Sequence, residues 1–120
     1  MKLKVIISRR FPLKGFKALT AWPFVFVRKD MKDSFGESDM RHETTHAIQQ
    51  AELFLLPFFI LYALEWLLKL LFCKFNGKRA YMSISFEQEA YEHQSEVYYN
   101  EVRRHYAWFR HVFTLTPYKK

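Results

Sequence analysis

The sequence predicts an α+β fold, in which a small N-terminal antiparallel sheet precedes a helical part. Before residue 29, three short runs are rich in Val, Ile, Leu and Phe, most of them residues that strands favour. From residue 38 onward, the sequence is typical of helices. Ser38 or Asp39 can cap the first helix, and Pro57 and Asn76-Gly77 are the expected points of interruption. The length of 120 residues is that of one domain, so residues 1–120 are expected to fold as a single unit.

The three candidate strands cover residues 3–8, 16–20 and 24–28. The third is the strongest candidate because Val and Phe dominate it and Pro23 stands at its start, where proline does not interrupt a ladder. Residues 29–37 are charged and contain a glycine, so a loop is expected there. At the edge of a cleft, the strand at 24–28 could bind an extended peptide as an added strand.

The first long helix should begin just before the central motif of the chain. Ser38 or Asp39 can cap its N-terminus, because short polar side chains accept hydrogen bonds from the first backbone amides. The helix is then expected to continue through Ala51 and to meet Pro57. Since proline lacks an amide hydrogen, it should kink or end the helix at that point.

The remaining helices are separated by one strong signal. Asn76-Gly77 is typical of a helix end, since both residues readily adopt left-handed backbone angles. A final helix should begin near Ser83 or Ser85 and run towards Phe113. The many aromatic side chains of this last helix are expected to be packing residues.

His42, Glu43 and His46 bear most directly on function. Residues four apart share one face of a helix, so the two imidazoles can reach a single metal ion. Glu43 directly follows the first histidine, where its carboxylate can hold a water at the metal and take its proton. This is the H-E-x-x-H pattern of zinc peptidases, and it predicts His42 and His46 as zinc ligands and Glu43 as the general base.

A catalytic zinc site needs a third protein ligand, and Ser85-Phe86-Glu87-Gln88-Glu89-Ala90-Tyr91 offers two carboxylates on a predicted helix. With both motifs, the sequence resembles the gluzincin peptidases, and most of all their membrane-linked branch of prenyl-protein and heat-shock peptidases. It also resembles small bacterial domains that pair an R-H-E-x-x-H helix, a Pro-interrupted apolar stretch and an S-F-E-x-E-A-Y motif, and this second resemblance covers roughly residues 9–95. The resemblance implies a minimal zincin-like fold with the metal site between two helices. It assigns Glu87 as third ligand, because Glu87 opens the family's E-x-E-A-D-like motif.

The chain departs from the family at Tyr91. The family has an aspartate there that orients a zinc-binding histidine, and a tyrosine could do so only through its hydroxyl. Glu89 stays open as an alternative third ligand, and Glu89 with His93 is an alternative metal pair because the two stand four residues apart. Candidates to stabilise an oxyanion are His93, Tyr98, Tyr99 and His105.

Residues 53–75 are apolar and about as long as a membrane span. Pro57, Glu65 and Lys69 interrupt them, and a span would place the two metal-binding motifs on opposite sides of the bilayer. The chain is therefore expected to fold back, with Glu65 and Lys69 paired on one helical face. Because so small a domain cannot cover an apolar helix on every side, the helix should dock on a membrane surface or form a homo-oligomer.

The formal charge of +7 favours anionic partners such as lipid or nucleic acid. Nucleic acid is not expected, because the Lys and Arg residues are scattered without a recognised binding motif. The single Cys73 fits a reducing compartment and is expected to be an inert core thiol. The first residues lack the apolar centre of a signal peptide, so a cytoplasmic location, with the option of peripheral membrane attachment, is expected.

Together the motifs predict zinc-dependent hydrolysis of peptide bonds, with Zn²⁺ as cofactor and a peptide or protein as substrate. Two other functions stay open. A non-catalytic zinc-binding adaptor at a membrane would keep the metal site without hydrolysis. A basic nucleic-acid-binding module is the weaker alternative, and metal-independent, salt-dependent binding of DNA or RNA would reveal it.

Overall fold

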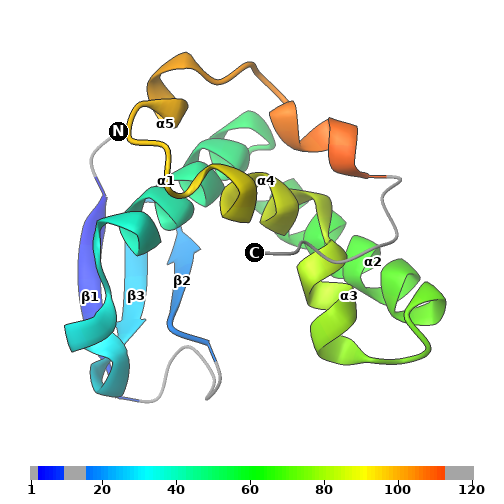
Figure 1. Ribbon diagram of the computed structural model, residues 1–120, viewed down its shortest axis with the longest axis horizontal. Coiled ribbons are helices and arrows are strands. Elements are labelled where there is room, and N and C mark those ends of the chain that lie inside the picture. The colour runs from blue at the N-terminus through cyan, green and yellow to red at the C-terminus, as the bar shows by residue number, and fades with distance from the viewer. Residues whose placement is uncertain (1–2, 10–15, 113–120) are drawn as a thin grey trace.

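The computed structural model describes residues 3–9 and 16–112, and it places a three-stranded sheet beside a group of helices (Figure 1). The strands are β1 (Lys4–Ser8), β2 (Ala18–Ala21) and β3 (Phe24–Arg28), arranged in the order β1-β3-β2. The predicted α+β class is confirmed. The sequence also predicted the positions of all three strands, and every predicted boundary lies within two residues of the observed one.

The sheet is mixed, so the prediction of an antiparallel sheet is wrong for β1. β2 and β3 are antiparallel, with Leu19 opposite Phe26, whereas β1 and β3 are parallel, with Ile6 opposite Phe26. The chain reverses twice between β1 and β3, and β3 then inserts between the other two strands, so it must run in the same direction as β1. β3 is therefore the central strand, with Val25 and Val27 buried, and it cannot form a cleft edge for a bound peptide.

The helical part begins directly after β3. Its elements in chain order are η1 (Lys29–Ser34), α1 (Glu37–Glu52), α2 (Leu56–Phe72), α3 (Gly77–Ser83), α4 (Ser85–His93), α5 (Tyr99–Val102) and η2 (Ala107–His111). The predicted loop is mostly the 3-10 helix η1. α1 starts earlier than predicted, with Gly36 at its N-cap. Asp39 does cap the helix end, but from inside the first turn, where its carboxylate accepts a hydrogen bond from Gly36 N at 3.0 Å.

The chain folds back between α1 and α2, as predicted. Phe54 and Leu55 adopt positive φ values of 58° and 63°, and the axes of the two helices differ by 111°. Pro57 lies in the first turn of α2, where a missing amide hydrogen costs no hydrogen bond. Within residues 3–9 and 16–112, no single helix is long and apolar enough to cross a membrane, although α1 and α2 meet that test together as a bent pair.

The predicted stop at Asn76-Gly77 is the start of a helix instead. α2 ends at Phe72, and the Asn76 side chain caps α3 by accepting a hydrogen bond from Arg79 N at 3.0 Å. Lys74 and Phe75 make the turn with positive φ. Asn76 therefore caps the N-terminus of α3, by accepting from a backbone amide that follows it, and does not end α2 as its C-cap.

The predicted long final helix is also wrong. α4 ends at His93, and the chain returns through α5 to pack η2 against α4. This return brings Arg103 Nε to 2.7 Å from Glu89 Oε2. In a continuous helix, fourteen residues would separate these two positions by about 21 Å. A long-range ion pair thus outweighs local helix propensity, and Phe113 lies outside the described residues.

The inner face of α2 contains a charged pair that lies in the protein interior. Lys69 Nζ lies 2.7 Å from Glu65 Oε2, which confirms the predicted pairing at i, i+4. Lys69 also donates to Ser83 O, and Glu65 accepts hydrogen bonds of 2.6 Å from both the amide and the hydroxyl of Ser85. Glu65 therefore caps the N-terminus of α4. Beside the pair, Phe58 and Phe86 form the aromatic core together with residues of η2.

Lys69→Met should destabilise the fold, because it leaves the Glu65 carboxylate without its cation in the interior. We expect a loss of about 3 kcal/mol in the free energy of unfolding, measured by urea denaturation. Lys78→Met makes the same change at an exposed position on α3 and should cost less than about 0.5 kcal/mol. Equal losses in both variants would show that the pair does not stabilise the fold.

Candidate metal centre

Two histidines from α1 and a glutamate from α4 meet inside the helical part. His42 and His46 lie one turn apart on α1, and Glu87 lies in the first turn of α4. The two helices pack against each other (Figure 1), and each of the three residues is at most 6% exposed. These are the three residues that the sequence singled out as ligands.

The three side chains converge at distances that suit a metal ion. His42 Nε2 lies 3.1 Å from Glu87 Oε1 and 3.1 Å from His46 Nε2. The third distance, from His46 Nε2 to Glu87 Oε1, is 3.2 Å. Tetrahedral zinc with bonds of about 2.0–2.2 Å sets its ligand atoms about 3.3–3.6 Å apart. Small movements of these side chains would therefore accommodate the ion.

Gln49 determines which nitrogen of His46 faces the centre. Its amide nitrogen donates to Phe86 O at 3.1 Å and to Glu89 Oε1 at 2.9 Å, so its oxygen points the other way. That oxygen lies 2.9 Å from His46 Nδ1 and accepts a hydrogen bond from it. His46 Nδ1 therefore carries a hydrogen, and Nε2 is the nitrogen that can bind a metal.

Gln94 does the same for His42. Nδ1 of His42 donates to Gln94 Oε1 at 2.9 Å, and Arg41 Nε holds the Gln94 carbonyl at 2.7 Å. Tyr91 instead packs the edge of its ring against His42, with ring centroids 4.4 Å apart, and its hydroxyl meets that of Tyr81 at 3.3 Å. Gln94 therefore occupies the hydrogen-bonding position at Nδ1 of His42, and the Tyr91 hydroxyl bonds to Tyr81 instead.

Glu87 is held as an anion. Its Oε1 faces both imidazoles, and its Oε2 accepts a hydrogen bond of 2.6 Å from the Tyr62 hydroxyl. Burial opposes ionisation of Glu87, but the neighbouring His46 and His42 hold its pKa well below the usual range. Burial and the Glu87 charge raise the pKa of Tyr62 well above its ordinary value, so Tyr62 keeps its proton and remains a donor.

The centre requires a positive charge between its three acceptor atoms. Burial by itself lowers the pKa of His46, but the charges of Glu87 and Glu43 outweigh this effect and raise the pKa to about 9. At neutral pH, a proton on His46 Nε2 supplies the charge in the metal-free chain. A divalent cation at the same point would serve all three acceptors together, which one proton cannot do.

Glu43 lies beside this centre without belonging to the ligand set. Its Oε1 accepts a hydrogen bond of 2.7 Å from the hydroxyl of Thr20 in β2. Gln50 lies about two turns further along the same face of α1. Its amide nitrogen donates to Thr20 O at 2.6 Å and its oxygen accepts from Trp22 N at 2.7 Å, so it joins β2 to α1. With Oε1 taken by Thr20, Oε2 is the oxygen left to accept a proton.

Glu89 is committed to a different network, which leaves Glu87 as the candidate third ligand. Arg103 contacts it through Nε at 2.7 Å and through a terminal nitrogen at 2.9 Å, and Tyr99 donates to it at 2.6 Å. Burial alone would raise the pKa of Glu89, but these donors lower it. His93 stacks on the Tyr99 ring. His93 also pairs with Glu96, and Glu89 positions Gln49, so no described contact supports the alternative metal pair of Glu89 and His93.

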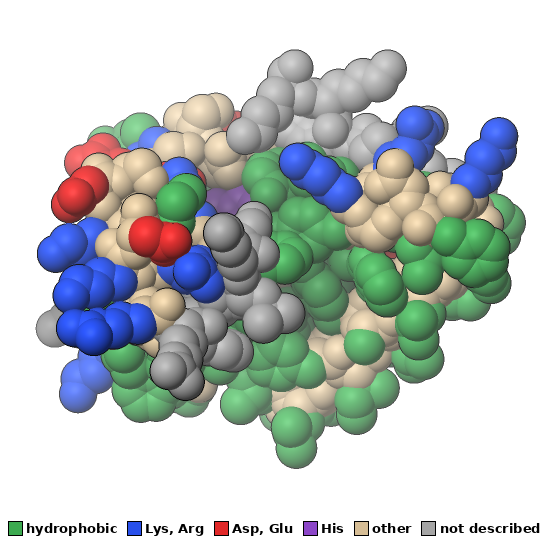
Figure 2. All heavy atoms as spheres, turned by 90° about the horizontal axis from the view of Figure 1, so that it is seen from below, with side chains coloured by type: hydrophobic (Ala, Val, Ile, Leu, Met, Phe, Trp, Pro, Cys, Tyr) green, Lys and Arg blue, Asp and Glu red, His purple; other side chains and the backbone are tan. Residues whose placement is uncertain are grey.

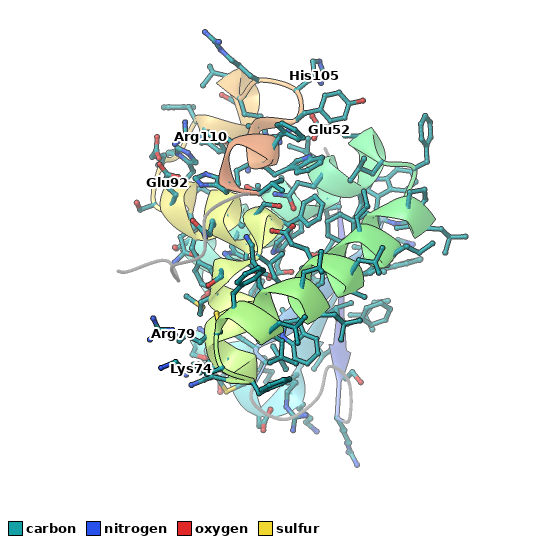
Figure 3. The ribbon with its side chains drawn as sticks, turned by 90° about the vertical axis from the view of Figure 1, so that its right-hand side faces the viewer. Glu52, Lys74, Arg79, Glu92, His105 and Arg110 are labelled. Atoms are coloured by element: carbon teal, nitrogen blue, oxygen red, sulfur yellow. The ribbon has the colours of Figure 1, made fainter. Side chains whose placement is uncertain are left out.

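The residues suggested for oxyanion stabilisation lie elsewhere. Tyr98 and His105 are exposed, and His105 faces Glu52 at 3.5 Å. Figure 3 shows both labelled residues, His105 and Glu52, at the far end of the helical part. Tyr99 is bound to Glu89. Among the described residues, the tyrosine whose hydroxyl donates to a ligand side chain is Tyr62 of α2, and nothing in the sequence marked it.

Four residues around the centre were not predicted from the sequence. They are Thr20, Gln49, Tyr62 and Gln94. Only Gln49 carries a local signal, because residues three apart on a helix are neighbours and Gln49 is three residues after His46. The others reach the centre through tertiary folding from β2, α2 and the end of α4.

Comparison of the chain with protein-family models, with curated protein sequences and with solved structures finds no match. The resemblance to gluzincin peptidases therefore stays a prediction from two motifs.

Metal binding should release a proton from His46. Because the pKa of His46 is raised to about 9, its imidazole is protonated at pH 7.5, and a metal ligand must be neutral. We expect zinc titration at pH 7.5 to release about one proton from this residue, and the affinity to rise as the pH approaches 9. Calorimetry in buffers of different ionisation enthalpy measures the release. Binding with no proton release at pH 7.5 would contradict this protonation state.

Proposed function

We propose that the chain is a zinc-dependent hydrolase of peptide bonds, with zinc held by His42, His46 and Glu87. One observation carries the proposal. Two imidazole Nε2 atoms and one carboxylate oxygen lie within 3.2 Å of one another, with each Nδ1 bound to a glutamine oxygen. This donor set of two histidines and one glutamate is that of catalytic zinc sites, which leave a fourth position for water or substrate.

A bound zinc ion supplies Lewis acidity, which polarises a carbonyl and lowers the pKa of a water towards about 7. Glu43 accepts a proton from the attacking water at Oε2, while the Thr20 hydroxyl holds Oε1. The water oxygen would bond to the carbonyl carbon of the substrate. The C–N bond would then break as Glu43 gives the proton to the amine nitrogen that leaves. Gln49 and Gln94 keep both imidazoles in one orientation during these transfers.

A non-catalytic zinc protein is the second candidate, and burial favours it. His42, His46 and Glu87 are 6%, 6% and 4% exposed, whereas a substrate must reach the fourth position of the ion. In that case zinc would join α1 to α4 and stabilise the fold, and an adaptor function would rest on other surfaces. The two candidates share one metal site and differ only in whether peptides are cleaved.

Glu43→Gln separates the two candidates. Since Glu43 handles the proton and not the metal, this variant should bind zinc like the wild type. Hydrolysis of a quenched fluorescent casein should fall by about 10²–10⁴-fold, the usual contribution of a general base. Glu37→Gln is a matched control at an exposed glutamate on the same helix and should leave both properties unchanged.

His46→Ala should lose both zinc and hydrolysis, because it removes a ligand. Wild-type cleavage that Glu43→Gln retains in full would contradict the assigned general base. Zinc binding by the wild type without cleavage of any peptide substrate would favour the non-catalytic candidate.

A further inference from the structure

One side of α2 is apolar and open. The outer face of α2 consists of Ile60, Leu64, Leu67, Leu68, Leu71 and Phe72, at spacings that place them along one side of the helix. All six are exposed, from 50% for Leu64 to 66% for Phe72. Figure 2 shows apolar side chains gathered over the half of the molecule that contains α2 and α3. Contiguous apolar surface of this extent marks an interaction site.

The opposite side of α2 is fixed against the protein. Phe58 packs on Phe86 with ring centroids 4.8 Å apart, Tyr62 donates to Glu87, and Lys69 pairs with Glu65. The helix cannot turn its leucines inward without breaking these contacts. Its only charged residues therefore point into the protein, and its apolar residues point away from it.

The C-terminal end of α2 is basic. Lys74, Lys78 and Arg79 are exposed there, and a shallow hollow is lined by Asn76, Lys78, Arg79 and Met82. In Figure 3, which faces α2, the labelled Lys74 and Arg79 lie together at one end of the helix, away from the labelled acidic residues Glu52 and Glu92. The apolar face thus continues into a cluster of cations.

We propose that α2 lies flat on an anionic membrane, with its outer face in the lipid and Lys74, Lys78 and Arg79 among the headgroups. An apolar helix face that is bordered by lysine and arginine is the composition of interfacial helices. Each cation near an anionic leaflet strengthens binding. The proposal is independent of the hydrolase activity, because no residue of the outer face contacts the metal ligands in a described interaction.

A flat orientation fits the packing better than a perpendicular one. α3 packs against α2, and the first turn of α4 contacts the inner face of α2 through Phe86 and Glu87. These two helices carry Lys78, Arg79 and the buried Glu89. If α2 crossed the bilayer, these charges would enter the lipid with it, at a large energetic cost. Two copies of the chain could instead cover the outer face by pairing. Each copy has a formal charge of +7, so repulsion between the copies opposes this pairing.

Vesicle flotation of the purified full-length chain tests the proposal. Bound protein floats with the vesicles, whereas aggregated protein sediments. We expect flotation with vesicles that contain about one-third phosphatidylglycerol in phosphatidylcholine. Replacing Leu64 and Leu68 by Gln should weaken binding at least about tenfold, since two apolar contacts with lipid are lost without a change of charge. Val97→Gln with Val102→Gln alters two exposed apolar residues beyond α4 and should bind like the wild type.

The basic end is tested with a second matched pair. Lys74→Gln with Lys78→Gln should weaken binding to the phosphatidylglycerol vesicles by about thirtyfold, in line with about 1 kcal/mol for each of the two cations. Lys29→Gln with Lys32→Gln removes the same charge from η1, near the sheet, and should have a much smaller effect. Folding of each variant is checked by circular dichroism.

Three results would overturn the proposal. The first is equal binding to vesicles of phosphatidylcholine alone. The second is resistance of the bound protein to extraction at alkaline pH, which would indicate a spanning helix. The third is absence of flotation together with dimers that the Leu64 and Leu68 replacements dissociate, which would assign the outer face to a second copy of the chain. Metal binding would be unaffected by any of these outcomes.

Discussion

A shared positive charge between His42, His46 and Glu87 is the interaction on which the structure depends. Three acceptor atoms within 3.2 Å of one another, in a buried contact between two helices, repel each other unless a cation lies between them. The surrounding hydrogen bonds do not remove this requirement. They increase it, because Gln49 and Gln94 fix the hydrogen of each imidazole on the far side of its ring. The charge can be a proton on His46 or a metal ion, and both join α1 to α4.

α2 connects this centre to the outside of the molecule. On its inner side, Tyr62 donates to Glu87 and Phe58 lies beside His46, with ring centroids 6.3 Å apart. On its other side lies the open row of leucines. A helix is about 10 Å in diameter, so whatever covers the outer face beside Tyr62 lies roughly one helix diameter from the metal ligands. Attachment of α2 to a membrane would hold the centre close to the lipid surface.

The sequence predicted the parts of the fold that depend on short-range spacing. The strand positions follow from runs of residues that strands favour, and the fold-back follows from Pro57. The Glu65–Lys69 pair and the meeting of His42 and His46 follow from a spacing of four residues on a helix. The choice of Glu87 over Glu89 came from the resemblance to a family. The structure gives the physical reason, since Arg103 and Tyr99 already bind Glu89.

The errors arose where a long-range contact decided the local structure. No pattern within residues 85–113 indicates that α4 should end at His93. The end of the helix is favoured by the contact between Glu89 and Arg103, which forms only after the chain has turned back. The parallel pairing of β1 with β3 likewise depends on the order of strands in space. The residues that orient the ligands, such as Thr20 and Tyr62, come from elements remote in sequence, so their spacing carries no signal.

X-ray absorption at the zinc edge of the metal-loaded chain tests the centre most directly. We expect two imidazole nitrogens and one carboxylate oxygen at about 2.0–2.2 Å, with a water or a second carboxylate oxygen completing the shell. Loss of one imidazole in His46→Ala should accompany weaker binding. A sulfur atom at about 2.3 Å would place the metal at Cys73 instead, and that result, or a shell without imidazole, would contradict the proposed centre.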